Sequence, residues 1–534
     1  MKRVACLFIS AFFLAGGVAY AQGEMDAYKM SQTDLNGTAR YLGMSGAFGA
    51  LGGDISSMST TPAGLGIYRS SEVVTTISLS SIKANTNWNG SKADESKTRF
   101  NFDNIAYVGY FPTGNDEGIV GWNLGVSYNR VKSFNRNYRM NGRQKNSLSD
   151  YVADLTYGIK AGDLKYDENK YDPYFDSNIP WLSILGWDAG YFDPNSNGKD
   201  EYVSALRGDL QNADLMVNEK GSIGQYNFSF ATNISDRFFL GATVAVTDMD
   251  YSLRTAYTET FPESARLSLE NGLSTSGTGY AFNIGAIVRP TDFLRLGVAY
   301  NSPTWYKLTD YFHGNASTTI GGESWPANTP DYQSGSYHLR TPDRWIFSVA
   351  GVGKSFLVSV DYELNNYKRM NLNDMDGVDL QATNDIKNDF GMSGTLKVGA
   401  EVKVTPQFSV RAGTLWRTSP MKQHVKDGIP PVKPDGTFYT DAIGVVGTVP
   451  NYTVDKGTNS YSIGIGYRFT PSFYMDLACV YRVYKEDAYA FPGTYQAGIS
   501  NINELLEEGV LVKSDPASLK TKTTQVALTL GYKF

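Results

Sequence analysis

The residues that could do catalytic or metal chemistry are few and lie far apart. The 534-residue chain holds three histidines and two cysteines. No G-x-S-x-G motif occurs, and a Ser–His–Asp hydrolase needs a histidine beside its nucleophile. His313 and His424 fall in long predicted loops and His338 near a predicted strand, with no His pair at a spacing useful for haem. We therefore predict no catalytic residue and no cofactor, and keep a haem-binding receptor as an alternative function.

One segment begins like a calcium-binding loop. Asp193, Asn195 and Asn197 place oxygens at positions 1, 3 and 5, followed by Gly198 at position 6. Ser204 stands where such a loop carries its bidentate Glu. Asn and Asp also favour ordinary turns. We interpret the segment as a solvated turn, and its three oxygen-bearing residues remain a candidate calcium site.

The N-terminus indicates secretion. Residues 1–3 are basic, residues 4–18 are mostly apolar, and residues 19–21 read Ala-Tyr-Ala, a small-x-small cleavage pattern. The apolar run is too short to span a bilayer. We predict a signal peptide over residues 1–21, whose removal leaves Cys479 as the only thiol.

The composition excludes several classes of protein. The net charge of −6 argues against a nucleic-acid binder, which would carry basic patches. After the N-terminal run no segment approaches 18 apolar residues, so a transmembrane helix is excluded. Only 19% of residues are charged, while Tyr (36) and Gly (54) are abundant. This mixture fits a β-protein that faces both lipid and water, and in lipid such a protein must be a closed barrel.

The last strand shows the pattern of a barrel wall. Val526, Leu528, Leu530, Tyr532 and Phe534 alternate with small or polar residues, so the two sets lie on opposite faces. A final strand that ends in Phe resembles the C-terminal signature of bacterial outer-membrane barrels. We expect the outer-membrane insertion machinery to recognise this terminus.

Similar segments recur through the chain, and their connections alternate between short and long. This asymmetry is typical of antiparallel strands that cross a membrane, with short turns in the periplasm and long loops outside. The longest loop is predicted over residues 134–220. We predict an all-β, monomeric, 14-stranded antiparallel transmembrane barrel over residues 72–534. The predicted strands are 72–82, 98–111, 118–133, 221–234, 237–254, 276–289, 293–302, 337–350, 355–366, 391–404, 407–417, 458–469, 473–485 and 521–534.

Residues 22–71 precede the first strand and are rich in glycine and other small residues. Small residues let backbones pack closely, whereas a free tail would be more polar. We therefore predict a compact N-terminal plug inside the barrel lumen. Its candidate functional residues are Gly46, Phe48, Asp54, Thr61, Pro62, Ala63, Gly64 and Leu65.

These plug residues carry a family resemblance. The run Ser45–Phe48, then Gly53-Asp54, then Thr61–Leu65 before the first strand resembles the plug of the FadL/TodX family of outer-membrane transporters. Residues 290–303 and 358–363 and the Thr341-Pro342 pair are also similar to that family, although Thr61 stands where the family has Asn. The resemblance implies capture of a hydrophobic ligand in an extracellular groove, rearrangement of the plug, and lateral exit into the membrane at an inward kink of the third strand.

The implied groove and kink have candidates in the sequence. Residues 179–187 are the most apolar loop segment of the mature chain, and they would otherwise form the small core of their own loop. The groove candidates are Trp181, Leu182, Ile184, Leu185 and Trp187. Gly121 and Gly125 are the kink candidates, because glycine often marks a bend in a strand.

The resulting prediction is an outer-membrane transporter of a Gram-negative bacterium. It would take up hydrophobic small molecules, fatty acids or aromatic hydrocarbons, with the membrane lipid and the ligand as its partners and no nucleic acid. A general porin and a surface adhesin remain alternatives beside the haem receptor, and a 22-stranded TonB-dependent receptor is disfavoured.

Overall fold

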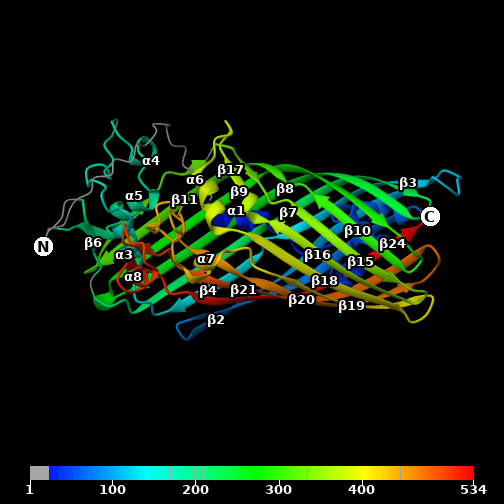
Figure 1. The fold of residues 1–534 in the computed structure, drawn as a ribbon. Coiled ribbons are helices and arrows are strands. Elements are labelled where there is room, and N and C mark those ends of the chain that lie inside the picture. Colours follow the sequence, from blue (N-terminus) through cyan, green and yellow to red (C-terminus); the bar gives the residue numbers. More distant parts are fainter. Residues whose placement is uncertain (1–22, 169, 196–199, 207, 334, 446) are drawn as a thin grey trace.

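A computed structural model describes residues 23–534 except 169, 196–199, 207, 334 and 446. The predicted signal peptide lies outside these residues. The described strands form one elongated barrel, with the C-terminus at one end and most short helices gathered at the other (Figure 1). Among the described helices, none is long and apolar enough to cross a membrane.

Within the described residues the wall consists of fourteen antiparallel spans, which confirms the predicted barrel. The barrel closes because the last strand pairs with the first, from Glu72 opposite Lys533 to Asn87 opposite Ser518. In order around the wall the spans are β1 (Glu72–Trp88), β2 (Ser91–Pro112), β3 (Ile119–Ser133) continued by β4 (Arg136–Gly142), β7 (Asn212–Ile234), β8 (Phe238–Thr260), β9 (Arg266–Val288), β10 (Leu294–Asn301) continued by β11 (Trp305–Ile320), β14 (Tyr337–Arg340) continued by β15 (Arg344–Val352), β16 (Phe356–Asn366), β18 (Met392–Lys403), β19 (Phe408–Arg417), β20 (Tyr452–Arg468), β21 (Phe473–Tyr489) and β24 (Ala517–Lys533).

Several spans are longer than the sequence predicted. β7, β8 and β9 each run for 23 residues and stay paired along their whole length. The predicted boundary of the 134–220 loop is therefore wrong, because β4 and the first half of β7 lie inside that range. The extensions carry polar residues on their outer faces, so the apolar alternation ends at the membrane edge while backbone pairing continues.

The remaining short elements lie in the long connections at one end, and we call this end the cap. They are α3 (Leu148–Leu155), α4 (Pro173–Asp176), α5 (Trp181–Asp188), β5 (Phe192–Pro194), β6 (Tyr202–Ser204), η3 (Pro262–Ser264), β12 (Glu323–Asn328), β13 (Tyr332–Gln333), η4 (Tyr367–Arg369), β17 (Asn371–Asn373), α6 (Gln381–Asp389), α7 (Gln423–Asp427), β22 (Thr494–Tyr495), α8 (Ile502–Glu507) and β23 (Val510–Val512).

The N-terminal segment before β1 forms four short helices: α1 (Glu24–Ser31), α2 (Ala39–Gly43), η1 (Ile55–Ser59) and η2 (Pro62–Ile67). η2 contacts β7, β8 and β9, and α2 contacts β20 and β21 on the opposite wall. Asp54 joins the pieces, because its carboxylate accepts hydrogen bonds from the Thr38 hydroxyl (2.8 Å) and the Ser56 N–H (2.9 Å). The segment thus lies across the lumen as one folded unit.

Glycines of the wall make room for this segment. Gly241 of β8 lies opposite Gly285 of β9, and a Cβ at Gly241 would come within 2.4 Å of the Pro62 carbonyl carbon. Gly399 and Gly413 lie opposite each other on β18 and β19, against the Met44 backbone. Any side chain at these wall positions would collide with backbone atoms, so glycine is required by close packing.

Candidate functional site: a luminal cavity and an incomplete seam

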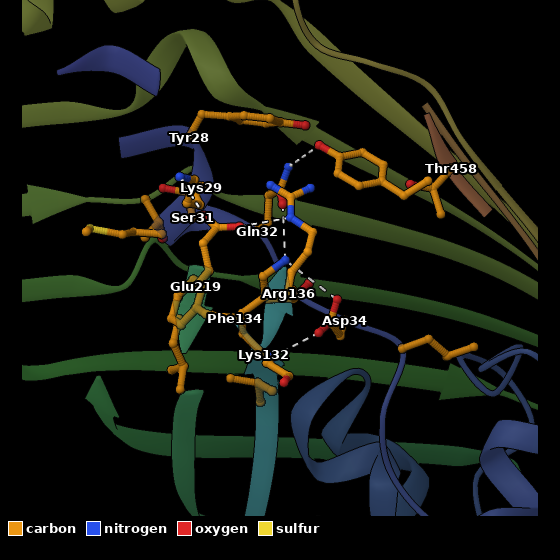
Figure 2. Close-up of a pocket in the computed structure, with 18 of the residues that line it drawn as sticks. Tyr28, Lys29, Ser31, Gln32, Asp34, Lys132, Phe134, Arg136, Glu219 and Thr458 are labelled. Atoms are coloured by element: carbon orange, nitrogen blue, oxygen red, sulfur yellow. Dashed lines mark hydrogen bonds and ion pairs between the residues drawn. The ribbon is translucent and has the colours of Figure 1, made fainter. Parts of the chain in front are cut away.

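A cavity of about 360 Å³ lies in the lumen beside the N-terminal segment. Its walls are α1 and the stretch that follows it, the ends of β3 and β4, the upper part of β7, and the loop before β20. Figure 2 shows one side of this space, where residues of the N-terminal segment face those of the wall: Tyr28, Lys29, Ser31, Gln32 and Asp34 against Lys132, Phe134, Arg136 and Glu219.

The cavity lining carries more positive than negative charge. Of the described residues that line it, nine are Lys or Arg and five are Asp or Glu, although the whole chain is acidic. The cations are Lys29, Arg99, Arg130, Lys132, Arg136, Arg344, Lys397, Arg417 and Arg482; the acids are Asp26, Asp34, Glu219, Glu363 and Glu486.

Most of these charges are joined in ion pairs, and three of the pairs link the N-terminal segment to the wall. Glu219 accepts from Lys29 (2.9 Å) and Arg136 (2.8 Å). Asp34 lies 2.7 Å from Arg482 and 3.6 Å from Lys132. Burial alone would raise the pKa of Asp34, but these two cations hold that pKa well below its usual range. Asp34 therefore stays ionised and ties the N-terminal segment to β3 and β21.

Two of the nine cations, Arg99 and Arg417, have no described carboxylate within ion-pair distance; Arg99 is exposed, whereas Arg417 is half-buried. Its guanidinium donates only to the Thr458 hydroxyl (3.2 Å) and to the Thr33 carbonyl (3.5 Å), and it lies over the Tyr484 ring. Its Nε is buried and has no hydrogen-bond partner among the described residues. A guanidinium in this state has donors left for an anionic group of a ligand.

The rest of the lining mixes hydroxyl and amide side chains with an apolar part. Leu35 and the side chains that β7, β8 and β9 direct inward contribute most of it, together with residues of the loop before β20. The cavity is therefore amphipathic, because cations and apolar side chains line the same space. The apolar members are Leu35, Ile82, Val131, Phe134, Val217, Ile223, Leu253, Leu273, Leu415, Ile443, Val445 and Val449.

The wall next to the cavity has an incomplete seam between β2 and β3. Pairing of the two strands runs from Pro112–Gly121 to Asn104–Asn129 and ends there, although β2 continues to Ser91 and is paired only with β1. Beyond Asn129, β3 has an irregularity between Arg130 and Lys132 and then breaks before β4, which pairs only with β7. Exposed Phe100 and Phe102 border the gap on the lipid side.

The third strand is therefore interrupted away from both predicted kink positions. Gly121 lies at a one-residue irregularity near the periplasmic end, and Gly125 sits in regular pairing with Ser229 and Val108, beneath Met58 of the N-terminal segment. The break falls between Ser133 and Arg136 instead. A bulge and the loss of β2 as a pairing partner precede this break, and neither needs glycine.

The N-terminal segment replaces β2 as the partner of β3 above the seam. The Asp34 N–H donates to the Val131 carbonyl (2.8 Å), and the Asp34 carboxylate accepts from the Ser133 N–H (2.9 Å). Asn36 donates to the Arg130 carbonyl (2.7 Å). Backbone groups that β2 leaves unpaired are thus satisfied from inside the barrel.

A bulge in β2 adds an ion pair across the seam. Asp103 is skipped in the pairing of β1 with β2, so its carboxylate points inward and is fully buried. It accepts from Arg130 of β3 (2.5 Å), from Asn36 (3.2 Å) and from Gln525 of β24 (3.2 Å). Sequence reasoning missed Asp103, Arg130 and Arg417, although the outward apolar residues change phase between Phe102 and Ile105, which is a sign of this bulge.

The groove candidates lie in α5 of the cap. Leu182, Ile184 and Leu185 are fully buried and Trp181 nearly so, while Trp187 is half-buried against Phe192 and Tyr202. Trp181 contacts Phe312 and Tyr332 of the neighbouring connections. In this conformation α5 forms the core of the cap, and a role in ligand capture stays a prediction.

The candidate plug residues all lie in the N-terminal segment. Phe48 packs on Tyr41 and beneath Arg40, and Gly46, with φ of 75°, sits against the same Tyr41 ring. Pro62, Ala63, Gly64 and Leu65 form η2 on the wall glycines. The Thr61 hydroxyl is buried and has no partner among the described residues, which fits its place where the family carries Asn.

The metal and haem candidates do not converge on the cavity. His313 and His338 are absent from the described residues that line it, and His424 hydrogen-bonds Asp389 in the cap (3.0 Å). Asp193 lies in β5 and Asn195 donates its N–H to Glu201, whereas Asn197 lies outside the described residues. Among the described residues no group of three His, Cys, Asp or Glu could hold a metal ion.

A closed 14-span barrel with a folded segment across its lumen and a cavity beside that segment has the architecture of a plugged outer-membrane barrel. Residues 221–461 match the family model described as outer membrane protein transport protein (OMPP1/FadL/TodX), which confirms the predicted resemblance. This match and the barrel fit the predicted location in the outer membrane of a Gram-negative bacterium.

Solved structures share the fold. A FadL homologue of Pseudomonas aeruginosa is 14% identical, with 94% of this chain and 99% of that chain covered and a TM-score of 0.51. A deletion mutant of the TodX monoaromatic hydrocarbon channel is 13% identical, with 94% and 100% covered and a TM-score of 0.50. No curated protein matches the chain.

Proposed function

We propose that this barrel takes up amphipathic anions with a hydrophobic body, such as fatty acids, and disfavours neutral aromatic hydrocarbons. The observation that carries the proposal is Arg417, a cation without a described carboxylate partner in a cavity that also has apolar lining residues. A carboxylate would complete the hydrogen bonds of the guanidinium, while an apolar tail would cover the apolar lining residues. A neutral aromatic ring would leave Arg417 without an anionic partner.

The same proposal includes the route out. The N-terminal segment acts as a plug, and the seam between β2 and β3 acts as the lateral exit. Asp34 and Asn36 contact both the cavity and the ends of β3, so a shift of the plug would remove the partners of β3 and open the seam. A ligand that leaves through this seam enters lipid and avoids crossing water.

Ligand binding to the purified full-length barrel tests the proposal. We expect oleate to bind more tightly than its methyl ester or toluene, and Arg417→Gln to weaken oleate binding roughly tenfold while leaving the ester unchanged. Arg340→Gln is the matched control, because Arg340 is exposed on β14 and does not line the cavity. Equal affinity of the wild-type barrel for oleate and its ester would contradict the anion preference.

A further inference from the structure

Four lysines on the outer wall form a patch, and none of them makes an ion pair with an acid of the described residues. Lys83 of β1 lies directly opposite Lys522 of β24, and Lys520 of β24 lies directly opposite Lys485 of β21. Directly opposite residues share a face with Cβ atoms ~5 Å apart, and like charges there destabilise a sheet. Two such pairs on three neighbouring strands would therefore be stabilised by anions that lie between the lysines.

No acidic group of the described residues neutralises this patch. None of the four lysines donates a described hydrogen bond or makes a described ion pair, and three of them are exposed while Lys522 is half-exposed. The two acids on the same face are engaged elsewhere. Asp94 accepts from Asn85 (2.5 Å) and Asp487 pairs with Lys456 (2.6 Å).

The patch sits at the outer edge of the lipid-facing band. Lys522 is ten residues from Tyr532 and Lys83 ten from Val73, and both of those residues face outward near the periplasmic end. Ten residues at ~3.3 Å each, on strands tilted by ~40°, span about 25 Å of height, the height of the apolar band of such barrels. The four ammonium groups therefore lie at the level of the lipid headgroups of the outer leaflet.

The same height on the opposite part of the wall carries the other sign of charge. Asp248 and Asp250 of β8 are exposed on the outer face, ten and twelve residues from Phe238. The lysines are thus a local feature of β1, β21 and β24. They are not part of a ring of cations around the barrel.

We propose that this patch binds the phosphate groups of the glycolipid in the outer leaflet. Phosphate is the anion that such a leaflet presents at this height, and clusters of basic side chains beside a membrane recognise phosphorylated headgroups. One phosphate between Lys83 and Lys522 and a second between Lys485 and Lys520 would turn two repulsive pairs into two bridges. The lipid would then hold three strands, among them β1 and β24, which close the barrel.

Binding of diphosphorylated lipid A to the detergent-solubilised full-length barrel tests the proposal, by native mass spectrometry in magnesium-free buffer. We expect Lys83→Gln/Lys522→Gln to bind about thirtyfold more weakly. Lys354→Gln/Lys403→Gln is the matched control, because both lysines are exposed beside periplasmic turns; it should bind like the wild type. An unchanged affinity of the first variant, or an equal loss in the control, would overturn the proposal.

Two further arms separate the source of the phosphate and guard against misfolding. Lipid A without phosphates should bind weakly; binding of inorganic phosphate as tight as that of lipid A would overturn the assignment to a lipid. Thermal unfolding supplies the second readout. Without lipid the double variant should be at least as stable as the wild type, since a repulsive pair is gone, whereas added lipid A should stabilise the wild type more. A variant destabilised to the same extent with and without lipid would also overturn the proposal.

Discussion

The seam between β8 and β9 is paired along its full length, whereas the seam between β2 and β3 is paired over only part of its length. β8 and β9 are paired over their full 23 residues, from Phe238–Val288 to Thr260–Arg266, and the plug rests on this seam through η2. β2 and β3 are paired over nine residues only, and above Asn104 the seam is bridged by Asp103, Arg130 and Asn36.

This difference separates a fixed wall from one that can move. Opening the β8–β9 seam would break a continuous ladder of backbone hydrogen bonds. The N–H and C=O groups freed in this way would lie unpaired in lipid. The upper β2–β3 seam has no described ladder pairs and is held by packing of β2 on β4 and by side-chain contacts such as Arg130–Asp103 and Lys97–Asn137. The plug contacts both seams. It packs closely on the backbone at Gly241 and makes polar contacts with β3. We therefore expect the part of the plug that contacts β3 to detach from the wall first.

The largest expected effect follows from removing the acid of the seam. Asp103→Ala would leave Arg130, which is largely buried, without its carboxylate, and we expect a loss of about 3–5 kcal/mol in local stability. Hydrogen exchange should rise in β3 near Arg130 and stay unchanged in β8 and β9. Asp214→Ala is the control, because its partner Arg139 on β4 is partly exposed and a surface pair contributes ~1 kcal/mol or less. Equal loosening of both seams would remove the distinction between them.

A smaller effect is expected at the fixed seam. Gly241→Ala forces a Cβ into the Pro62 backbone, and we expect a loss of about 1–3 kcal/mol, measured by thermal unfolding of the barrel in detergent. Gly391→Ala is the control, because the nearest described atom to its added Cβ would be 3.6 Å away. A variant as stable as the wild type would show that the plug does not rest tightly on this wall.

The hydrogen bonds that link the plug to the β2–β3 seam are expected to contribute less to stability than the contacts at Gly241. Asn36→Ala removes hydrogen bonds to the Arg130 carbonyl and to Asp103, so we expect a loss of about 1 kcal/mol and faster ligand release into vesicles. Thr33→Ala supplies a neighbouring control on the same segment. Unchanged ligand release would show that the contact between the plug and β3 does not control the exit.

The smallest effect concerns pH at the cap end of the plug, where α1 packs on α6. Burial, then the neighbouring Asp389, raises the pKa of Asp385 to about 6, and burial with Asp385 and Asp389 also raises the pKa of Glu24. Asp441 adds to this repulsion at Asp385, while His424 and Lys422 face Asp389. The folded state therefore binds more protons than the unfolded state between about pH 4 and pH 6.

The α1–α6 contact should consequently strengthen as the pH falls from 7.5 to 5.5. Protection of α1 amides against exchange, corrected for the intrinsic rate, should rise a few-fold, and Asp385→Asn should abolish most of this change. The β2–β3 contacts of the same plug should not respond in this way, because Asp34 keeps a low pKa through Lys132 and Arg482. A pH response at both ends would show that the two ends of the plug respond as a single unit.

The sequence determined the class of the fold because its signals are local. Alternation in segments such as 525–534 shows which face meets lipid, and the alternating lengths of the connections give the number of spans. The glycines and small residues of 22–71 indicated a packed segment, since close approach of backbones needs small side chains.

Only the tertiary structure decided where the wall is incomplete and which charges matter. Asp103 and Val131 are skipped in the pairing of their strands, and only the paired strands show that Asp103 then meets Arg130 across the seam. Arg417 became a candidate because partners from distant strands neutralise most of its neighbours and leave it free of a carboxylate. The four outer lysines looked like separate surface charges in the sequence, and strand register alone brings them together.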